Sequence, residues 1–267
     1  MPTIDSQGLD GGSREGEKAA MRILILGGTG EAAELARAIS RDPDLDATLS
    51  LAGRTAAPQP QALPVRIGGV GGAEGLAAHL RAARIDRLID ATHPFAARIS
   101  ANAATAAEAA RVPLLAIRRP AWTREFGDTW TEVGSVAEAA EALGEAPRTV
   151  FVTVGRNEVA AFAAAPQHRY LVRTIEPVDG ALAVPHLVEI RARGPYDAAA
   201  EEGLMARHGV DVLVSKNAGG AATAGKIAAA RRLGLPVVMV RRPEKPAVES
   251  VTDAAGALRW LGIRASG

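Results

Sequence analysis

The sequence contains no cysteine, and aromatic residues make up only 3% of its 267 residues. The absence of cysteine excludes disulfides, thiolate nucleophiles and thiolate-ligated metals. The few aromatic side chains are too sparse to form a platform on which nucleic-acid bases stack. No apolar run approaches the roughly 20 residues that a membrane span requires. The 31 basic and 30 acidic residues nearly balance, which argues against nucleic acid or an anionic membrane as the main partner.

Several catalytic motifs are also missing. Tyr170 and Tyr196 are followed at the Tyr-x-x-x-Lys spacing by Thr174 and Ala200, so the catalytic pair of short-chain dehydrogenases is absent. The chain has no Gly-x-x-x-x-Gly-Lys-Ser/Thr phosphate loop, no Gly-x-Ser-x-Gly elbow and no His-Glu-x-x-His. Its five histidines show no ligand spacing, so we do not expect metal catalysis.

What the sequence does contain is a glycine-rich turn after its first apolar run. Residues 23–26 are continuously apolar, which is typical of a buried parallel strand. Gly28-x-Gly30-x-x-Ala33 then fits the dinucleotide-binding fingerprint. A helix from Glu31 would direct its N–H groups and the positive end of its dipole at a phosphate. The alternative is a strand-to-helix turn without a ligand.

Short apolar runs alternate with alanine-rich segments from Met21 onward, which predicts an α/β fold with mainly parallel sheets. Both halves of the chain end with a strand, a loop, a helix and a Pro-led strand that exits in Arg-Arg-Pro. In the first half we expect strands at 22–26, 47–52, 64–67, 87–91 and 113–117, and helices near 31–40, 73–83 and 94–110.

This repetition predicts two Rossmann-like lobes with a cleft between them, residues 21–120 and 121–267. The alternative is one large sheet whose halves are similar by coincidence. Residues 1–20 are polar and without periodicity, and we interpret them as a disordered extension or an expression remnant. A cytoplasmic location is the default.

In doubly wound sheets, ligands bind beyond the carboxyl ends of the strands. Arg54 follows the strand expected at 47–52. A guanidinium at this place suits a ribose 2′-phosphate and so favours NADPH over NADH. The alternative is a surface arginine.

The segment Asp90-Ala-Thr-His-Pro-Phe-Ala96 lies at the same edge, after an apolar strand. We expect the following helix to begin at Pro94, because proline suits the first helical position. His93 is a candidate acid or hydrogen-bond donor to the substrate, since its ordinary pKa lies near neutrality. The alternative is that Thr92 or His93 only caps the helix.

The second half has a corresponding loop, Ser215-Lys-Asn-Ala-Gly-Gly220. Lys216 and the glycine-rich backbone there can bind carboxylates, whereas the alternative is a solvated lysine. Arg156 follows the opening strand of the second half in the same way.

Four segments together resemble the precorrin-6A reductase family of cobalamin biosynthesis, and the resemblance runs from about Met21 to Leu261. Asp-Ala-Thr-His-Pro-Phe-Ala is the most family-specific of them, and the glycine turn the least. The segments are residues 27–32, 90–96, 215–220 and 235–243.

The resemblance implies NADPH-dependent reduction of precorrin-6A to precorrin-6B, with NADPH on the first lobe and the macrocycle in the cleft. The implied cofactor-binding residues are Gly28, Thr29, Gly30, Glu31, Arg54 and Thr92. The implied substrate-binding residues are Asp90, His93, Arg156, Ser215, Lys216, Asn217, Gly219 and Thr223. His93 and Lys216 are candidate proton donors, and water is the alternative donor.

Two rival functions remain open at this point. A non-catalytic NADP(H) sensor would use the same glycine turn, but it would not need a second loop rich in carboxylate-binding groups. An NADPH-dependent reductase of another acidic metabolite would need both the glycine turn and the second loop. For a reductase of precorrin-6A or of another metabolite, we expect a monomer or homodimer that binds a small molecule and uses no metal.

Overall fold

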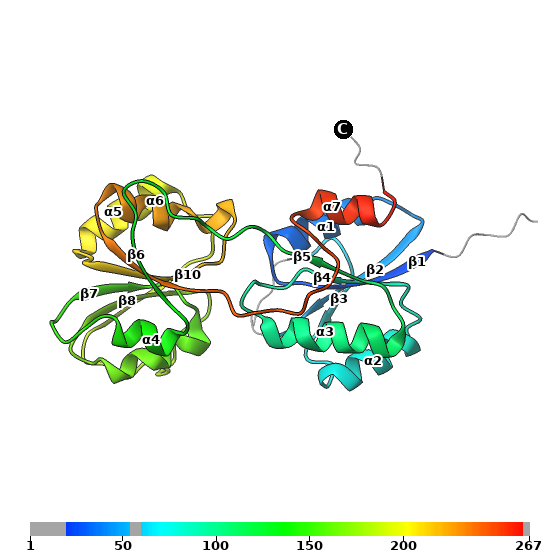
Figure 1. The fold of residues 1–267 in the computed structure, drawn as a ribbon, viewed down its shortest axis with the longest axis horizontal. Coiled ribbons are helices and arrows are strands. Elements are labelled where there is room, and N and C mark those ends of the chain that lie inside the picture. Colours follow the sequence, from blue (N-terminus) through cyan, green and yellow to red (C-terminus); the bar gives the residue numbers. More distant parts are fainter. Residues whose placement is uncertain (1–19, 54–59, 264–267) are drawn as a thin grey trace, which may run out of the picture.

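Two six-stranded sheets, each entirely parallel, form the framework of the part of the chain that the computed structural model describes, residues 20–53 and 60–263 (Figure 1). Every strand pair in both sheets runs parallel. The α/β class and the two lobes predicted from the sequence are confirmed, and the single large sheet is wrong. Residues 1–19, the first part of the expected extension, lie outside the described residues.

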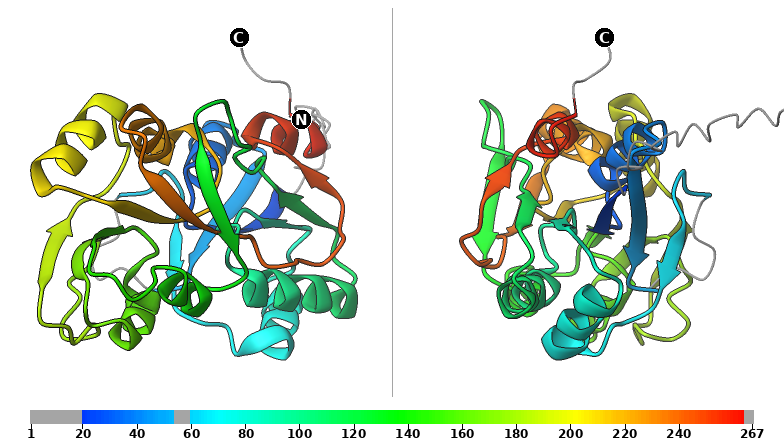
Figure 2. Two further views of the ribbon diagram at one scale, coloured as in Figure 1. Left: turned by 60° about the vertical axis from the view of Figure 1, so that its left-hand side comes forward. Right: turned by 90° about the vertical axis from the view of Figure 1, so that its right-hand side faces the viewer.

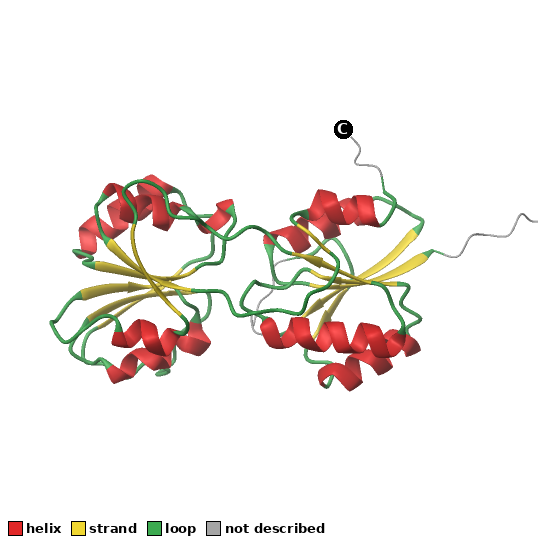
Figure 3. Ribbon diagram, in the orientation of Figure 1, coloured by secondary structure: helices red, strands yellow, loops and turns green. Residues whose placement is uncertain are grey.

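The first sheet has the strand order β12-β5-β4-β1-β2-β3. Alternate residues of β1 face opposite sides, so Ile23 and Ile25 pack under α1 and α7 while Leu24 and Leu26 pack under α2 and α3. These two helix layers enclose the sheet (Figure 3; Figure 2, right). The strands are β1 (Met21–Leu26), β2 (Leu45–Leu51), β3 (Val65–Ile67), β4 (Arg87–Asp90), β5 (Leu114–Ile117) and β12 (Ser250–Val251). The helices are α1 (Gly30–Ile39), α2 (Gly72–Ala82), α3 (Ala97–Ala110) and α7 (Ala254–Trp260).

The second sheet repeats this plan in the order β6-β11-β10-β7-β8-β9. Phe151 packs under α5 and α6, whereas Val150 and Val152 pack under α4 and the 3₁₀ helix η1. The strands are β6 (Thr129–Val133), β7 (Thr149–Val152), β8 (Arg169–Thr174), β9 (Leu187–Arg191), β10 (Val212–Lys216) and β11 (Pro236–Val240). The helical segments are α4 (Val136–Glu141), η1 (Arg156–Ala164), α5 (Ala198–His208), η2 (Ala221–Thr223) and α6 (Gly225–Arg232).

The two lobes exchange their sixth strands. Each order matches the dinucleotide-binding order 3-2-1-4-5-6 if the sixth strand comes from the other half of the chain. β6 follows β5 in the chain but pairs with β11, and β12 follows β11 but pairs with β5. Residues 250–263, which the sequence assigned to the second lobe, therefore pack on the first. Two segments, residues 118–128 and 241–249, cross between the lobes (Figure 1).

Helix α3 begins later than the sequence predicted. Its first residue is Ala97, not Pro94, and its N-cap, Ala96, makes no side-chain capping bond. The N–H of Ala96 donates to the carbonyl of His93 at 2.8 Å, so residues 93–96 form a separate turn. The alternative that Thr92 or His93 caps this helix is therefore wrong.

Candidate active site

A cavity of about 720 Å³ lies where the carboxyl ends of the two sheets face each other. Its walls are loops that follow strands of both lobes, the position at which doubly wound sheets bind ligands. The first lobe contributes residues 27–33, 51–53 and 92–93, and the second contributes residues 193–195 and 218–223.

The glycine turn forms one wall of this cavity. Gly28 has a φ of +111°, which a residue with a side chain rarely adopts. A Cβ at Gly28 or Gly30 would meet no atom within 4 Å, so glycine leaves open space in front of the backbone. Thr29 caps α1 by accepting from the N–H of Ala32, and its hydroxyl donates to the carbonyl of Ala91 at 2.8 Å. The turn is thereby fastened to the loop that carries Thr92 and His93.

Asp90 is buried beneath the cavity and does not line it. It accepts hydrogen bonds from Thr92 Oγ1 and Ser100 Oγ, both at 2.6 Å, and from Arg118 Nη2 at 2.8 Å. Burial opposes its ionisation, but the charge of Arg118 and these hydrogen bonds outweigh burial and lower the pKa of Asp90. Asp90 is thus an ionised carboxylate that orients Thr92, which does line the cavity.

His93 lines the cavity as a neutral imidazole. Its Nδ1 accepts from the N–H of Phe95 at 3.2 Å, which places the ring proton on Nε2. Burial is the main reason that the pKa of His93 falls to about 3, and nearby positive charges lower it further. Those charges belong to Arg119, Lys216, Lys245 and Lys226.

Three residues of the predicted second-lobe loop contact protein and not the cavity. Ser215 is fully buried, and its hydroxyl donates to the carbonyl of Lys216 at 3.1 Å. Lys216 forms an ion pair with Glu158. The side-chain amide of Asn217 exchanges two hydrogen bonds with the backbone of Trp122, at 2.8 and 2.9 Å. The contact between Asn217 and Trp122 holds the loop against the crossing segment 118–128.

The remaining predicted residues divide between the cavity and other places. Gly219 and Thr223 line the cavity together with Gly28, Thr29, Gly30 and Glu31. Arg156 is partly exposed and pairs with Asp179 at 3.2 Å, away from the cavity wall. Arg54 lies outside the described residues.

Arg119 is a cavity residue whose role the sequence did not indicate, although it belongs to the repeated Arg-Arg-Pro exit. Its Nη1 donates to Glu31 Oε2 at 2.7 Å, and its Nε donates to the carbonyl of Ala218 at 2.7 Å. Burial raises the pKa of Glu31, but the bond from Arg119 outweighs this and lowers it. Arg119 therefore joins the N-terminus of α1 to the second-lobe loop.

Lys226 and Arg193 also line the cavity, from the second lobe. Lys226 lies in the first turn of α6 and is only 6% exposed. Burial lowers its pKa to about 7, the charge of Arg173 lowers it further, and Glu201 raises it. In the sequence, only its position after the glycine-rich loop indicated that Lys226 could belong to the site. A lysine at such a position is ordinarily solvated, so its place in the cavity wall follows only from the tertiary packing.

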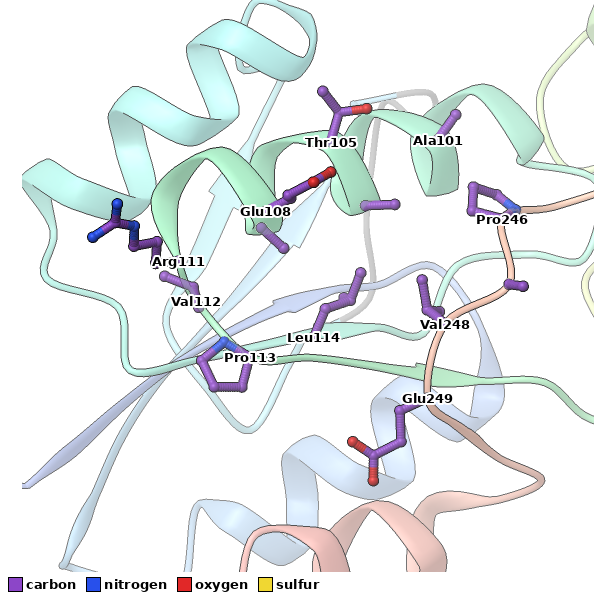
Figure 4. A pocket seen from close by; sticks show the side chains of 13 residues that line it. Ala101, Thr105, Glu108, Arg111, Val112, Pro113, Leu114, Pro246, Val248 and Glu249 are labelled. Atoms are coloured by element: carbon purple, nitrogen blue, oxygen red, sulfur yellow. The ribbon is translucent and has the colours of Figure 1, made fainter.

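A second hollow, of about 690 Å³, lies on the outer side of the first lobe, between α3 and residues 246–249 (Figure 4). Pro113 and Leu114 line it at the amino end of β5. Ligands of doubly wound sheets bind at the opposite, carboxyl ends of the strands. This hollow is therefore separate from the candidate active site.

Residues 20–53 and 60–263 contain no group of three or more His, Cys, Asp or Glu side chains that could hold a metal ion. Within the same ranges, no helix combines the length and hydropathy needed to cross a membrane.

The chain is similar to known proteins of one family. Residues 22–262 match the family described as Precorrin-6x reductase CbiJ/CobK. A precorrin-6A reductase of Sinorhizobium sp is 52% identical over 90% of this chain and 94% of its own length. One from Rhodococcus erythropolis is 49% identical over 90% and 97%. The solved structure of CobK precorrin-6A reductase superimposes with a TM-score of 0.87 at 43% identity, covering 91% of this chain and 96% of that one.

Proposed function

The chain belongs to the precorrin-6x reductase family, and we propose that it reduces precorrin-6A to precorrin-6B with NADPH as the reductant. The observation that carries this proposal is the cavity between the lobes, which joins a glycine turn to a wall of cationic and N–H donors. A non-catalytic sensor needs only the turn. The second wall therefore favours the enzyme.

The residues of the glycine turn suit a nicotinamide dinucleotide, the cofactor class of these reductases. The open space in front of Gly28 and Gly30 admits a pyrophosphate to the backbone. Thr29 and Thr92 border the same space with hydroxyl groups. When bound, the nicotinamide supplies the hydride of the reaction.

The opposite wall suits a substrate that carries several carboxylates, such as a precorrin macrocycle. Arg193 and Lys226 on this wall, and Arg119 between the two walls, place positive charge on the cavity, and the loop that carries Gly219 and Gly220 lines it beside them. The neutral His93 offers Nε2–H as a hydrogen-bond donor. We assign these groups to binding and orienting the macrocycle.

We further propose that the substrate is metal-free. The relatives from Sinorhizobium sp and Rhodococcus erythropolis are named precorrin-6A reductases. The relatives named cobalt-precorrin-6A reductases, from Priestia megaterium and Methanothermobacter thermautotrophicus, are only 28% and 26% identical. Turnover of precorrin-6A that exceeds turnover of its cobalt complex would agree with this assignment, and the reverse order would contradict it.

The proposal is tested with purified protein, precorrin-6A and each nicotinamide cofactor. NADPH oxidation should depend on precorrin-6A, and NADH should be a much poorer reductant. NADPH binding without turnover would favour the sensor. Turnover only with a different anionic metabolite would favour the other reductase.

Arg54 provides the test of cofactor preference. Arg54→Ala should raise the KM for NADPH by roughly tenfold to a hundredfold, the effect of losing charge-assisted hydrogen bonds worth about 1.5–3 kcal/mol. The KM for NADH should change little. Arg41→Ala is the control, because Arg41 is exposed just beyond the far end of α1. Equal losses with both cofactors would remove Arg54 from the 2′-phosphate site.

A further inference from the structure

We infer that Lys226 donates the proton of the reduction, an inference that rests on the proposed function. Saturating one double bond of the macrocycle adds a hydride and a proton. The hydride comes from the nicotinamide, which is oxidised, and forms a C–H bond at one end of the double bond. The ammonium of Lys226 releases its proton to the other end, becomes a neutral amine and is reprotonated by solvent.

The position of Lys226 suits this role. It comes from α6 in the second lobe, whereas the glycine turn comes from the first lobe, and both line one cavity. A macrocycle between them would meet the cofactor on one side and Lys226 on the other. Because the side chain is buried, water can reach the ammonium only from the cavity. A macrocycle bound in the cavity would displace most of that water.

No acidic side chain in the described ranges engages the ammonium of Lys226. Glu201 is near enough to affect it, but Arg173 holds both carboxylate oxygens of Glu201, at 2.5 and 2.8 Å. The Lys226 ammonium contacts the ring of Trp122 instead, 5.6 Å from its centroid. A buried ammonium that faces a cavity without an acidic partner is available to a ligand.

Other titratable groups of the described cavity wall are poor proton donors. Arg119 and Arg193 carry guanidinium groups, which do not deprotonate near neutral pH. His93 is neutral, with its Nδ1 occupied by a backbone N–H. Glu31 is ionised beside Arg119 and holds no proton to give.

The two other lysines near His93 are engaged outside the wall. Lys216 pairs with Glu158, and Lys245 Nζ donates to the carbonyl of His93 at 2.9 Å. Neither residue lines the cavity. Both candidates that the sequence indicated as proton donors, His93 and Lys216, are therefore less suited to the role than Lys226.

The charges around Lys226 define the expected pH dependence. Arg173 on β8 favours its neutral form and Glu201 on α5 favours its charged form, while His93 lies near enough for its own pKa to respond to Lys226. A proton donor must be protonated in the free enzyme. Since the pKa of Lys226 is about 7, kcat/KM should fall as the pH rises above that value.

The experiment compares Lys226→Arg, Lys226→Met and the wild type in the full-length protein with NADPH and precorrin-6A. Arginine keeps the charge but not the ability to release a proton. Both variants should lose about 100-fold or more in kcat. Lys226→Arg should bind precorrin-6A within roughly threefold of the wild type in an absorption titration. In Lys226→Arg, the remaining kcat/KM should no longer fall as the pH rises above about 7.

Chemical rescue separates proton donation from charge and from folding. Ethylammonium should restore kcat of Lys226→Ala by about tenfold or more, whereas tetramethylammonium, which has no N–H, should not. Arg232→Met, which removes an exposed cation from the last turn of the same helix, should behave as the wild type.

If Lys226→Arg kept about a third or more of the wild-type kcat, the inference would be overturned, and Lys226 would serve only to bind the anionic substrate through its charge. Equal rescue by both ammonium ions would overturn it as well. A wild-type protein that does not reduce precorrin-6A would instead overturn the proposed function. The two failures are therefore distinguishable.

Discussion

At the scale of single residues, the active site depends on which side chains keep or lose a proton. His93 does not hold a second ring proton, because burial and four neighbouring cations keep its imidazole neutral. Asp90 stays ionised because Arg118 and two hydroxyl groups compensate its burial. Asp90 and His93, three positions apart, thus serve as a structural anion and a neutral hydrogen-bond donor, roles that their identities alone do not distinguish.

The neutral state of His93 leads to a prediction about stability. Its pKa is about 3 in the folded protein and near 6.5 in the unfolded chain, so the unfolded chain takes up the proton first as the pH falls. The free energy of unfolding should therefore decrease as the pH is lowered from about 6.5 towards 3. His93→Gln should reduce this slope in denaturant titrations of the ligand-free protein, whereas His186→Gln, at an exposed position, should not. Identical slopes in all three proteins would contradict the neutral imidazole.

At the scale of elements, the loop after β10 is held by the segments that cross between the lobes. Arg242 donates from Nε to the carbonyl of Asn217 at 2.8 Å and from Nη1 to the carbonyl of Arg119 at 2.8 Å. Its Nη2 donates to the carbonyls of Pro120 and Ala218, at 3.0 and 2.9 Å. One guanidinium thus connects both crossing segments to the loop that lines the cavity.

Gly219 permits this close approach, and its substitution tests it. It has a φ of +66°, and a Cβ there would collide with the carbonyl oxygen of Pro120 and with Arg242. Gly234 has a φ of +65° but open space around it. Gly234→Ala should cost only backbone strain, about 1–2 kcal/mol, and Gly219→Ala should cost clearly more in the free energy of unfolding. Equal losses in denaturant titrations would show that the contact with the crossing segments is unimportant.

At the scale of the whole molecule, the exchange of sixth strands makes each lobe depend on both halves of the chain. β12 extends the first sheet beside β5, and α7 places Ala254, Ala257 and Leu258 in the first core. α1 and α7 pack together, so the helix that begins at the glycine turn rests on the C-terminal helix. The cofactor wall therefore depends on residues near the far end of the sequence.

A truncation tests this dependence. A chain that ends at Glu249 lacks β12 and α7, and its free energy of unfolding should fall by roughly 3 kcal/mol or more, because buried apolar contacts of the first core are lost. The affinity of this shorter chain for NADPH, measured through the fluorescence of the nucleotide, should also fall. A chain that ends at Ile263 keeps α7 and is the control. Unchanged cofactor affinity in the shorter chain would contradict the dependence of the cofactor wall on the contact between α7 and α1.

Much of the first lobe was predictable from local patterns. β1, β2, β3, β4 and β5 lie within two residues of their expected bounds, because a short apolar run between turn residues is the same signal in any context. Of the predicted site, the glycine turn, Thr92, His93, Gly219 and Thr223 do line the cavity. Lys216 and Asn217 do not, because their side chains contact Glu158 and Trp122, partners that are distant in the sequence.

Local patterns are enough to specify the fold class and the glycine turn, since strand periodicity and a left-handed backbone at Gly28 are set by neighbouring residues. Which sheet receives β6 and β12 is settled only in the folded molecule. An isolated strand can pair at either sheet edge, and the choice depends on contacts far apart in the chain. The same holds for Lys226. Its exclusion from water, and its lack of an acidic partner among residues 20–53 and 60–263, result from the packing of α6 against Trp122, Arg173 and Glu201.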